Sequence, residues 1–332
     1  MKRASFLAAT TAIALLVLAA PANATHVSCG DTITVNTTLD SDVVCPEFRS
    51  FGVLIAADNV TLRLAGHTID GMGNVAEGIF THHAVTNGPV SGVQIRGGTI
   101  VGFQFATRLR GSNNLVQGVR FDSTILFEGV EGGPTNRAIL NEQVGAPTGG
   151  GIGFSSFQSV FTDDAYATRN TVYAIGTHAV RNPRIVVNQV NCIDVIDYTT
   201  SAVIARNTVT GCEDDGITVA PFGAGSGGSS SGGASVRRNF VTGSTPFGIN
   251  VDDPGSRVWC NMANGNGEGI RLQRSGDLVD ENTANNNTGF GINAAAGTID
   301  GGGNAATGNG TNCVNVACGT TSTCTRSFGP GG

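Results

Sequence analysis

The sequence predicts an all-β fold: a right-handed parallel β-helix, a solenoid of about ten to eleven coils with disulfide-stapled caps. Seven asparagines each follow a small or branched apolar residue by three positions, and the last four are 22, 21 and 22 residues apart. They are Asn170, Asn188, Asn207, Asn239, Asn261, Asn282 and Asn304. A period near 22 is typical of a solenoid, in which each coil buries its apolar face against its neighbours.

Each coil is predicted to contain three short strands. Alternating apolar pairs follow a glycine corner, which indicates strands with one buried face. The pairs are Ile217 with Val219, Ile249 with Val251, Ile270 with Leu272, and Ile292 with Ala294. One strand precedes the asparagine, a second follows it, and the third begins at the glycine. A leucine-rich repeat would need an LxxLxL pattern, which is absent, and a hexapeptide β-helix would need a multiple of six.

The recurring asparagine has a structural explanation. Asn tolerates left-handed backbone angles at a tight corner, and amides stacked one strand apart can bond along the axis. In earlier coils His67, Gly98 and Gly118 fall at this position, and Asn141 comes next. Longer intervals indicate loops at residues 81–88, 145–151 and 223–234, the last a glycine and serine tract that is flexible by composition.

The amino-terminal residues 1–24 have the pattern of a secretory signal: Lys2 and Arg3, an apolar run, and a small-residue site before Thr25. The run is too short for a spanning helix, and no later segment approaches that length. We expect a protein that is secreted, periplasmic or at the cell surface. The predicted division is 1–24 signal peptide, 25–58 amino-terminal cap, 59–312 parallel β-helix and 313–332 cysteine-containing tail.

Eight cysteines in an exported chain favour disulfides. Cys29 with Cys45 would close the cap, and Cys192 with Cys212 occupy nearly the same place on successive coils, within disulfide range at the spacing of stacked strands. The pairing of the other four stays open: Cys260, Cys313, Cys318 and Cys324. Zinc is the alternative, but CxxC and HxxxH pairs are missing, so no metal site is predicted.

The charge balance bears on partners. Lys2 and Arg3 fall in the signal, which leaves 17 arginines against 25 acidic residues and a net charge near −8. That balance argues against nucleic acid and against an anionic membrane surface. It permits a neutral polysaccharide, or an acidic one held by local arginines. No cofactor is predicted, calcium has no motif to support it, and the oligomeric state is left open.

The opening pattern resembles the start of secreted bacterial β-helix repeat proteins of the pectin lyase-like superfamily. It comprises Cys29 to Thr34, then Cys45 and Pro46, then VLIAADNVTLRLAGHTIDG at residues 53–71. The NxVxG units resemble the parallel β-helix repeat over nearly all of the mature chain. The resemblance implies the fold strongly and the function weakly, because that group holds polysaccharide lyases, hydrolases and epimerases as well as members without known activity.

A candidate binding face lies on the strands after the glycine corners. If the isoleucines there point inward, the next residues form an outward polar column of substrate-binding candidates: Thr218, Asn250, Arg271 and Asn293. Such a column suits the hydroxyls of a linear glycan, and Arg271 suits a uronate carboxylate. Solvated surface is the plain alternative.

Acidic residues at the same corners are the catalytic candidates. Asp214 and Asp215 precede Gly216, and Glu268 takes the matching place two coils on, a separation near that of an inverting glycosidase. CEDDGITV at 212–219 resembles the paired-aspartate strand of polygalacturonases, although Phe247 stands where that family has histidine and its Arg-x-Lys lysine is missing. Carboxylates at strand corners also commonly accept turn amides.

Asp252, with Asp253 and Pro254, resembles the Asp-Pro motif of alginate epimerases without its histidine, and is a further substrate-binding candidate. Two functions follow from these features. The first is a secreted protein that binds an extracellular polysaccharide and, if it is an enzyme, acts as a lyase, glycoside hydrolase or epimerase. The second is a noncatalytic envelope or surface protein that presents loops on a rigid rod.

Overall fold

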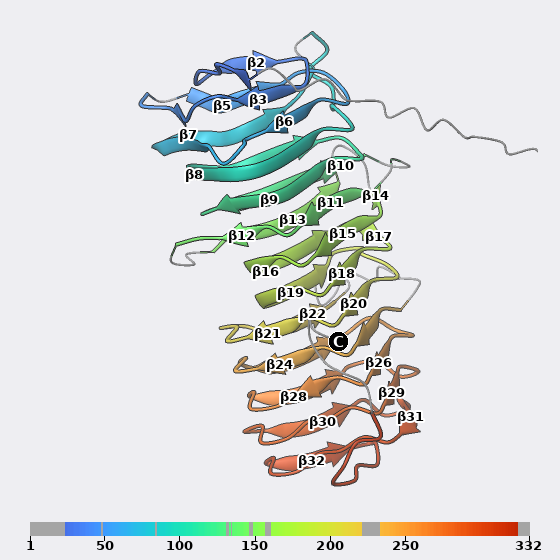
Figure 1. Ribbon diagram of the computed structural model, residues 1–332. Coiled ribbons are helices and arrows are strands. Elements are labelled where there is room, and N and C mark those ends of the chain that lie inside the picture. The colour runs from blue at the N-terminus through green and yellow to red at the C-terminus, as the bar shows by residue number, and fades with distance from the viewer. Residues whose placement is uncertain are drawn as a thin grey trace, which may run out of the picture.

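The structure is a computed structural model that describes residues 24–47, 49–83, 85–130, 133, 135–145, 149–156, 161–220 and 233–324. The predicted signal peptide up to residue 23, residues 146–148 and 221–232 of two predicted loops, and the tail beyond 324 lie outside these residues. The described chain winds into a stack of coils that runs from the amino-terminal to the carboxyl-terminal strands as one elongated rod (Figure 1). All described strand pairings within the stack are parallel, as predicted.

Three faces make up the rod, each built from one strand per coil. Face I comprises the strands before the asparagine position: β3 (Thr37–Leu39), β6 (Thr61–Arg63), the start of β8 (Gln94–Arg110), the start of β9 (Leu115–Phe121), β11 (Asn136–Ile139), β15 (Ala165–Thr168), β18 (Arg184–Val186), β20 (Val203–Ala205), β23 (Ser235–Arg237), β26 (Arg257–Trp259), β29 (Leu278–Asp280) and β31 (Ile299–Gly302). These twelve strands define twelve coils, slightly more than predicted. The difference arises partly because Thr37–Leu39, assigned to the cap from sequence, already forms a strand in register with β6.

Face II follows the asparagine position. It comprises β4 (Val43–Val44), the start of β7 (Thr68–Thr81), the middle of β8, the end of β9, β12 (Glu142–Gln143), the start of β16 (Thr171–His178), the start of β19 (Gln189–Ile196), β21 (Thr208–Thr210), β24 (Phe240–Thr242) and β27 (Met262–Ala263).

Face III follows the glycine corner. It comprises β2 (Asp31–Ile33), β5 (Arg49–Ile55), the ends of β7, β8, β16 and β19, β10 (Thr124–Gly129), β13 (Gly151–Ser156), β22 (Ile217–Val219), β25 (Phe247–Val251), β28 (Glu268–Leu272), β30 (Phe290–Ala294) and β32 (Thr311–Val314). Outside the three faces, β1 (Ala24–Thr25) pairs with β3, and β14 (Thr162–Asp163) pairs with β17 (Val180–Arg181).

The core is a set of apolar columns that run along the rod axis. On face III, Ile193, Ile217, Ile249, Ile270 and Ile292 are register partners in successive coils, and each is fully buried. Removing these side chains from water is the main favourable term of the fold. Because a strand exposes alternate residues to opposite sides, the residue after each isoleucine faces outward. The inward isoleucines therefore set the outward column.

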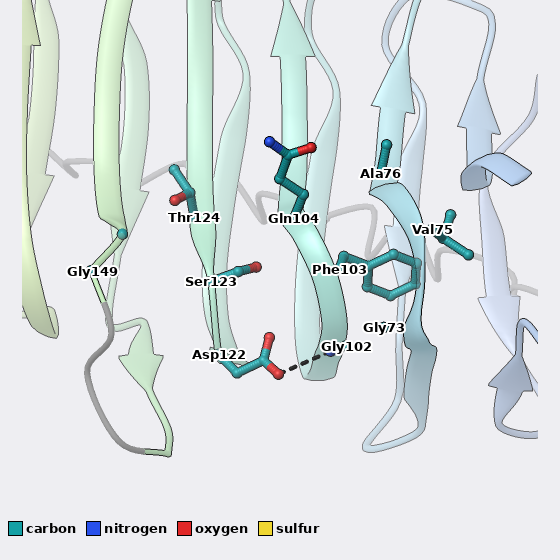
Figure 2. A pocket seen from close by; sticks show the side chains of 11 residues that line it. Gly73, Val75, Ala76, Gly102, Phe103, Gln104, Asp122, Ser123, Thr124 and Gly149 are labelled. Atoms are coloured by element: carbon teal, nitrogen blue, oxygen red, sulfur yellow. Dashed lines mark hydrogen bonds between the residues drawn. The ribbon is translucent and has the colours of Figure 1, made fainter. Parts of the chain in front are cut away.

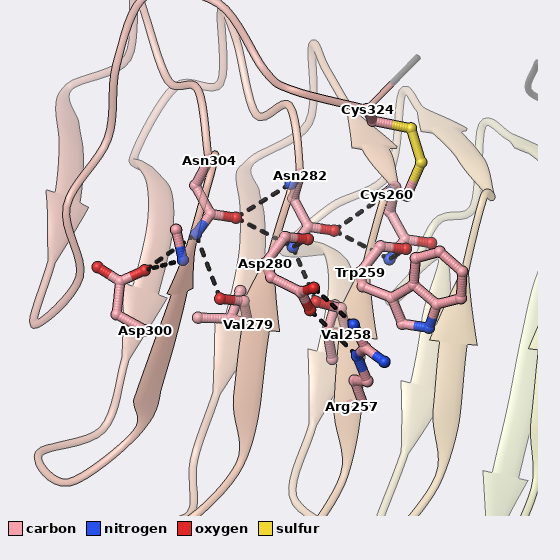
Figure 3. Close-up of polar contacts among 12 residues, drawn as sticks. Arg257, Val258, Trp259, Cys260, Val279, Asp280, Asn282, Asp300, Asn304 and Cys324 are labelled. Carbon is pink, nitrogen blue, oxygen red and sulfur yellow. Dashed lines mark hydrogen bonds and ion pairs between the residues drawn. A yellow bond between two sulfur atoms is a disulfide. The ribbon is translucent and has the colours of Figure 1, made fainter. Parts of the chain in front are cut away.

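The asparagines stack as predicted into a continuous ladder from Asn141 to Asn304, every member buried. Asn239 shows the pattern. Its Oδ1 accepts bonds from the backbone N–H and Nδ2 of Asn207, and its Nδ2 donates to the carbonyl of Ile204 and to Oδ1 of Asn261. Figure 3 shows the end of the ladder at Asn282 and Asn304. Every polar atom of the amide is satisfied, so burial of the ladder costs little.

Two details of the predicted corner were wrong. The left-handed backbone angle falls on the residue before the asparagine, among them Leu140, Arg169 and Val187 with φ of 57°, 56° and 62°, and not on the asparagine itself. The ladder asparagine must point its amide into the stack, which places the sharp turn one residue earlier. For the same reason Gly118, with φ 64°, is the turn residue, and Val119 stands at the ladder position.

A second amide ladder runs beside the first and was not predicted. The backbone N–H groups of Ser244, Asn266 and Asn287 donate to Oδ1 of Asn266, Asn287 and Asn309, respectively. It holds the next corner, where face II turns into face III.

Four disulfides staple the described coils. Cys29–Cys45 and Cys192–Cys212 form as predicted, with Cα atoms 5.3 and 5.4 Å apart. The four cysteines left open pair as Cys260–Cys324 and Cys313–Cys318. Within the described residues, no helix is both long enough and apolar enough to cross a membrane.

Candidate functional site

The outward column on face III lies in register over five coils. Asp194, Thr218, Asn250, Arg271 and Asn293 are successive Cα partners, and all five side chains are half-buried. The structure thus brings the four predicted column residues together and adds Asp194 at one end. Neighbouring strands of a sheet lie about 4.8 Å apart, so the column presents a polar group at each such step along the rod.

Asp215 lies at the corner beside this column and is nearly buried, with 8% of its surface exposed. Its Oδ2 accepts a bond of 2.7 Å from Nδ2 of Asn250 and a long one of 3.5 Å from the Thr218 hydroxyl. Its Oδ1 accepts the backbone N–H of Phe247 at 3.3 Å. Asp214 is exposed, and its Oδ1 accepts the backbone N–H of Asp215. Burial raises the pKa of Asp215, and the charge of Asp214 raises it further, while the bond from Asn250 opposes both effects.

Asp194 is the residue that sequence reasoning missed. Burial raises its pKa to about 6, and the charges of Asp214 and Asp215 add to the rise, while a hydrogen bond from Thr218 lowers it. Three carboxyls therefore lie close enough to repel one another across the Thr218 hydroxyl. The sequence hides Asp194 because Cys192, and not glycine, occupies the corner of this coil. The signal present was Ile193, which aligns with Ile217.

Arg271 is the fourth of the five residues of the column, between Asn250 and Asn293. Its guanidinium lies 4.7 Å from the ring centroid of Phe247, and no carboxylate among the described residues forms an ion pair with it. Glu268 is the register partner of Phe247, and the backbone N–H of Phe247 donates to Asp215 on its other side. Strand β25 therefore lies between Glu268 and Asp215. Glu268 is half-buried. The arrangement leaves Arg271 available to an anionic group on a ligand.

The last predicted residue, Asp252, is held by an ion pair. One of its carboxyl oxygens lies 2.5 Å from Nε of Arg274, and the Arg274 Nε also reaches the Asp252 carbonyl. It lies just after the end of β25, two residues after Asn250, and therefore beside the column. Its charge is already matched within the protein.

Beyond Asp194 the column loses its side chains. The next two register partners towards the amino terminus are Gly176 and Gly153, followed by Leu126 and Arg108. A Cβ added at Gly176 would meet nothing closer than the carbonyl of Asp194 at 3.9 Å. These two glycines form a bare platform on face III, bounded by Leu126 at one end and by Asp194 at the other.

A groove of about 840 Å³ opens at the start of the same strands, over the amino-terminal coils. Figure 2 shows Gln104, Ser123 and Thr124 along its wall and the Asp122 carboxylate bonded to the backbone N–H of Gly102. The second carboxyl oxygen of Asp122 and the Ser123 hydroxyl are buried without a protein partner. None of the catalytic or substrate-binding residues predicted from the sequence lines this groove.

The described residues contain no group of three or more His, Cys, Asp or Glu side chains arranged to hold a metal ion. At the acidic corner, burial raises the pKa of both Asp194 and Asp215, and carboxyls perturbed in this way are common at functional sites. Glu213 and Asp214 point to solvent, while Asp194 and Asp215 are the shielded pair.

Comparisons with known proteins add one finding. No family model matches the sequence, and no curated protein matches it. Among solved structures, the chain is similar to a mutant of the periplasmic alginate epimerase AlgG, with a TM-score of 0.45 and 14% identity over 89% of this chain and 77% of that one. A likeness at this level says nothing of substrate or reaction.

Proposed function

We propose that the protein binds an extracellular polysaccharide along face III, with the sugar chain lying over the glycine platform and the column from Asp194 to Asn293. The observation that supports this most is the in-register run of five half-buried polar side chains on a flat parallel sheet. A linear polymer meets a repeated surface of this kind with one group per coil. Arg271 would pair with a carboxylate on an acidic sugar.

We further propose that Asp194 transfers a proton to or from the bound sugar. Its pKa of about 6 leaves it protonated in a useful fraction near neutral pH, as a general acid requires. Beside it, Asn250 and the Phe247 amide stabilise the charge of Asp215 and so oppose the rise that burial and Asp214 cause in its pKa. Glu213, Asp214 and Glu268 are further carboxyls within this region. Hydrolysis would use the protonated Asp194 to protonate the glycosidic oxygen, whereas β-elimination and epimerisation would use the ionised Asp194 to remove a proton from a sugar carbon.

A second candidate is a noncatalytic surface protein. The bonds to Asp215 favour it, because a carboxylate that accepts Asn250, Thr218 and a backbone amide holds the corner together without any ligand. In that case face III would bind a partner without catalysing a reaction on it.

The test uses the purified mature protein with neutral, pectic and alginate glycans. New reducing ends without unsaturated uronate report hydrolysis, new reducing ends with absorbance of unsaturated uronate report elimination, and exchange of sugar C–H with deuterated water without cleavage reports epimerisation. We expect Asp194→Asn to abolish turnover while binding persists, and Gly176→Val to abolish binding. The control Thr210→Leu adds bulk on face II and is expected to leave both unchanged.

Three outcomes test the two candidates. Turnover by wild type that survives Asp194→Asn contradicts the proton-transfer role. Equal glycan binding by wild type and Gly176→Val removes the platform from the binding site. Binding without turnover on every glycan supports the noncatalytic candidate.

A further inference from the structure

Arginine is concentrated on face I, the sheet that does not carry the column. Six strands of this face contribute outward or edge arginines, and three more precede the ladder asparagine at its corner, on a chain whose net charge is −6. They are Arg63, Arg96, Arg137, Arg184, Arg237 and Arg257 on the strands, and Arg169, Arg206 and Arg238 at the corner. Among the described strands of face I, β29 and β31 carry a carboxylate each, Asp280 and Asp300. Arginines therefore outnumber carboxylates on the strands of this face.

Arg137, Arg184 and Arg237 are among the arginines of this face that form no ion pair with a carboxylate of the described residues. Arg137 also has a buried Nε without a hydrogen-bond partner. Within the described part of the chain, Arg237 donates to the neighbouring Ser235 hydroxyl, and burial together with the charges of Arg184 and Arg206 lowers its pKa. Such mutual repulsion is unfavourable unless an anion offsets it. By contrast, Arg257 is matched by Asp280 at 2.7 Å.

A groove follows this face along the rod axis. It has a volume of about 730 Å³ and takes its lining from five successive coils. Arg137, Tyr166, Arg184 and Val203 are register partners and run along its floor. Asp164 and Asn182 stand at its margin. Because the floor residues repeat from coil to coil, the groove is parallel to the rod and suits a linear chain.

The aromatic content of the face also constrains the ligand. The ring of Trp259 lies within 4.9 to 5.8 Å of the guanidiniums of Arg237, Arg238 and Arg257, and Figure 3 shows it beside Arg257 and the Asp280 carboxylate. Its surroundings are cationic, so the ring helps to hold the arginines in place. Tyr166 is the aromatic side chain that lines the groove.

We propose that face I binds an acidic polysaccharide, whose carboxylates pair with Arg137 and Arg184 in the groove and with Arg237 beyond it. Guanidinium binds a planar carboxylate through two parallel hydrogen bonds, which Arg137, Arg184 and Arg237 offer at every second coil. A nucleic acid fits less well, since the protein as a whole is acidic and Trp259 is already covered by guanidiniums. The disulfides also belong to an oxidising compartment outside the cytosol. This surface is separate from face III and does not rest on the function proposed there.

The experiment measures binding of the mature protein to polygalacturonate, with dextran as the uncharged polymer and single-stranded and duplex DNA as the alternative polyanions. We expect wild type to bind polygalacturonate with an affinity that falls as salt rises, and not to bind dextran through this face. The double variant Arg137→Gln with Arg184→Gln should weaken polygalacturonate binding about tenfold or more, because two charge-assisted pairs are lost. The double change to Lys keeps the charge and loses the bidentate geometry, so its affinity for polygalacturonate should fall between those of wild type and the double Gln variant.

Two matched controls locate the effect. Arg120→Gln removes an arginine of face II that pairs with Glu142, and should leave the affinity unchanged. Arg271→Gln reports on face III, and a loss there with none at Arg137 and Arg184 would assign acidic-glycan binding to face III and overturn this inference. Tighter binding of DNA than of polygalacturonate, lost in the double Gln variant, would also overturn it by making the ligand a nucleic acid. Unchanged melting temperatures and circular dichroism show that the variants are folded.

Discussion

The change Asn239→Ala tests the ladder most directly, because Asn239 sits in its middle with no exposed surface. The substitution deletes four hydrogen bonds of its side chain. The backbone N–H of Asn207 and one Nδ2 hydrogen of Asn207 are left as buried donors without an acceptor. The carbonyl of Ile204 loses a donor as well.

The magnitude follows from the cost of a stranded buried group, about 1–3 kcal/mol each. With two donors stranded, we expect the free energy of unfolding to fall by about 4 kcal/mol. The matched control is Asn293→Ala, which deletes the same amide from an outward position where it makes no described hydrogen bond. Its cost should stay within about 0.5 kcal/mol, as for surface substitutions generally.

A third variant separates hydrogen bonding from volume. Asn239→Asp has the shape of asparagine, but an ionised carboxylate would set an oxygen against the Ile204 carbonyl and Oδ1 of Asn261. We expect it to be less stable than Asn239→Ala at neutral pH and to recover at low pH, where the protonated acid can donate one bond. Its pKa in the folded protein would therefore be raised.

The assay is equilibrium urea unfolding followed by far-ultraviolet circular dichroism and by intrinsic fluorescence, with disulfides intact. A solenoid can lose cooperativity at a weakened coil, so two transitions in Asn239→Ala would also agree with the reasoning. The hypothesis fails if Asn239→Ala unfolds at the same urea concentration as Asn293→Ala.

Three further predictions concern separate features. Burial raises the pKa of Asp277 to about 6, so the native state holds its proton more tightly than the unfolded chain. The resulting stability is present below about pH 4 and is lost as pH rises through about 6. The free energy of unfolding of Asp277→Asn should therefore exceed that of wild type by roughly 3 kcal/mol at about pH 7.5 but not at about pH 3.5, measured by urea unfolding at both. Replacing Cys192 and Cys212 together by serine should cost roughly 3 kcal/mol in the same assay, from the regained freedom of a short loop, and an unchanged midpoint would contradict this. Asn266→Ala in the second ladder should lower the free energy of unfolding by about 2 kcal/mol because it leaves the Ser244 backbone N–H without its acceptor. The exposed Asn286 is not a member of that ladder, so Asn286→Ala should leave the ladder bonds in place.

Much of the fold is predictable because the ladder asparagines recur in the sequence at a regular spacing. The spacing of Asn239, Asn261 and Asn282 implies stacked coils, and stacking then places Cys192 near Cys212 without further information. The corner geometry was not predictable in the same way. The residue with the left-handed angle is Leu140 in one coil, Arg169 in another and Val187 in a third, so its residue type carries no signal.

The site shows the same limit. Thr218, Asn250 and Arg271 were found because each follows an isoleucine behind a glycine corner, but Asp194 follows Cys192 and escaped that pattern. The second ladder was present in the sequence as Asn266, Asn287 and Asn309, each five residues after a member of the first, and the stronger repeat concealed it. The row of arginines on face I appears only once the unequal loop lengths are removed by the register of β11, β15 and β18.

The ladder bonds give the rod a polarity. Each asparagine's main-chain amide donates to the side chain of the coil that follows it in the chain, so every coil is completed by its successor. Within the described residues, the ladder ends at Asn304 and the segment after this coil turns back: the Ser322 hydroxyl donates to the Glu281 carbonyl, the Thr323 N–H donates to the Gly303 carbonyl, and Cys324 is bonded to Cys260. A chain cut before this return strap would end in an open template, able to recruit another molecule's first free strand, whereas the strap covers that end of the stack.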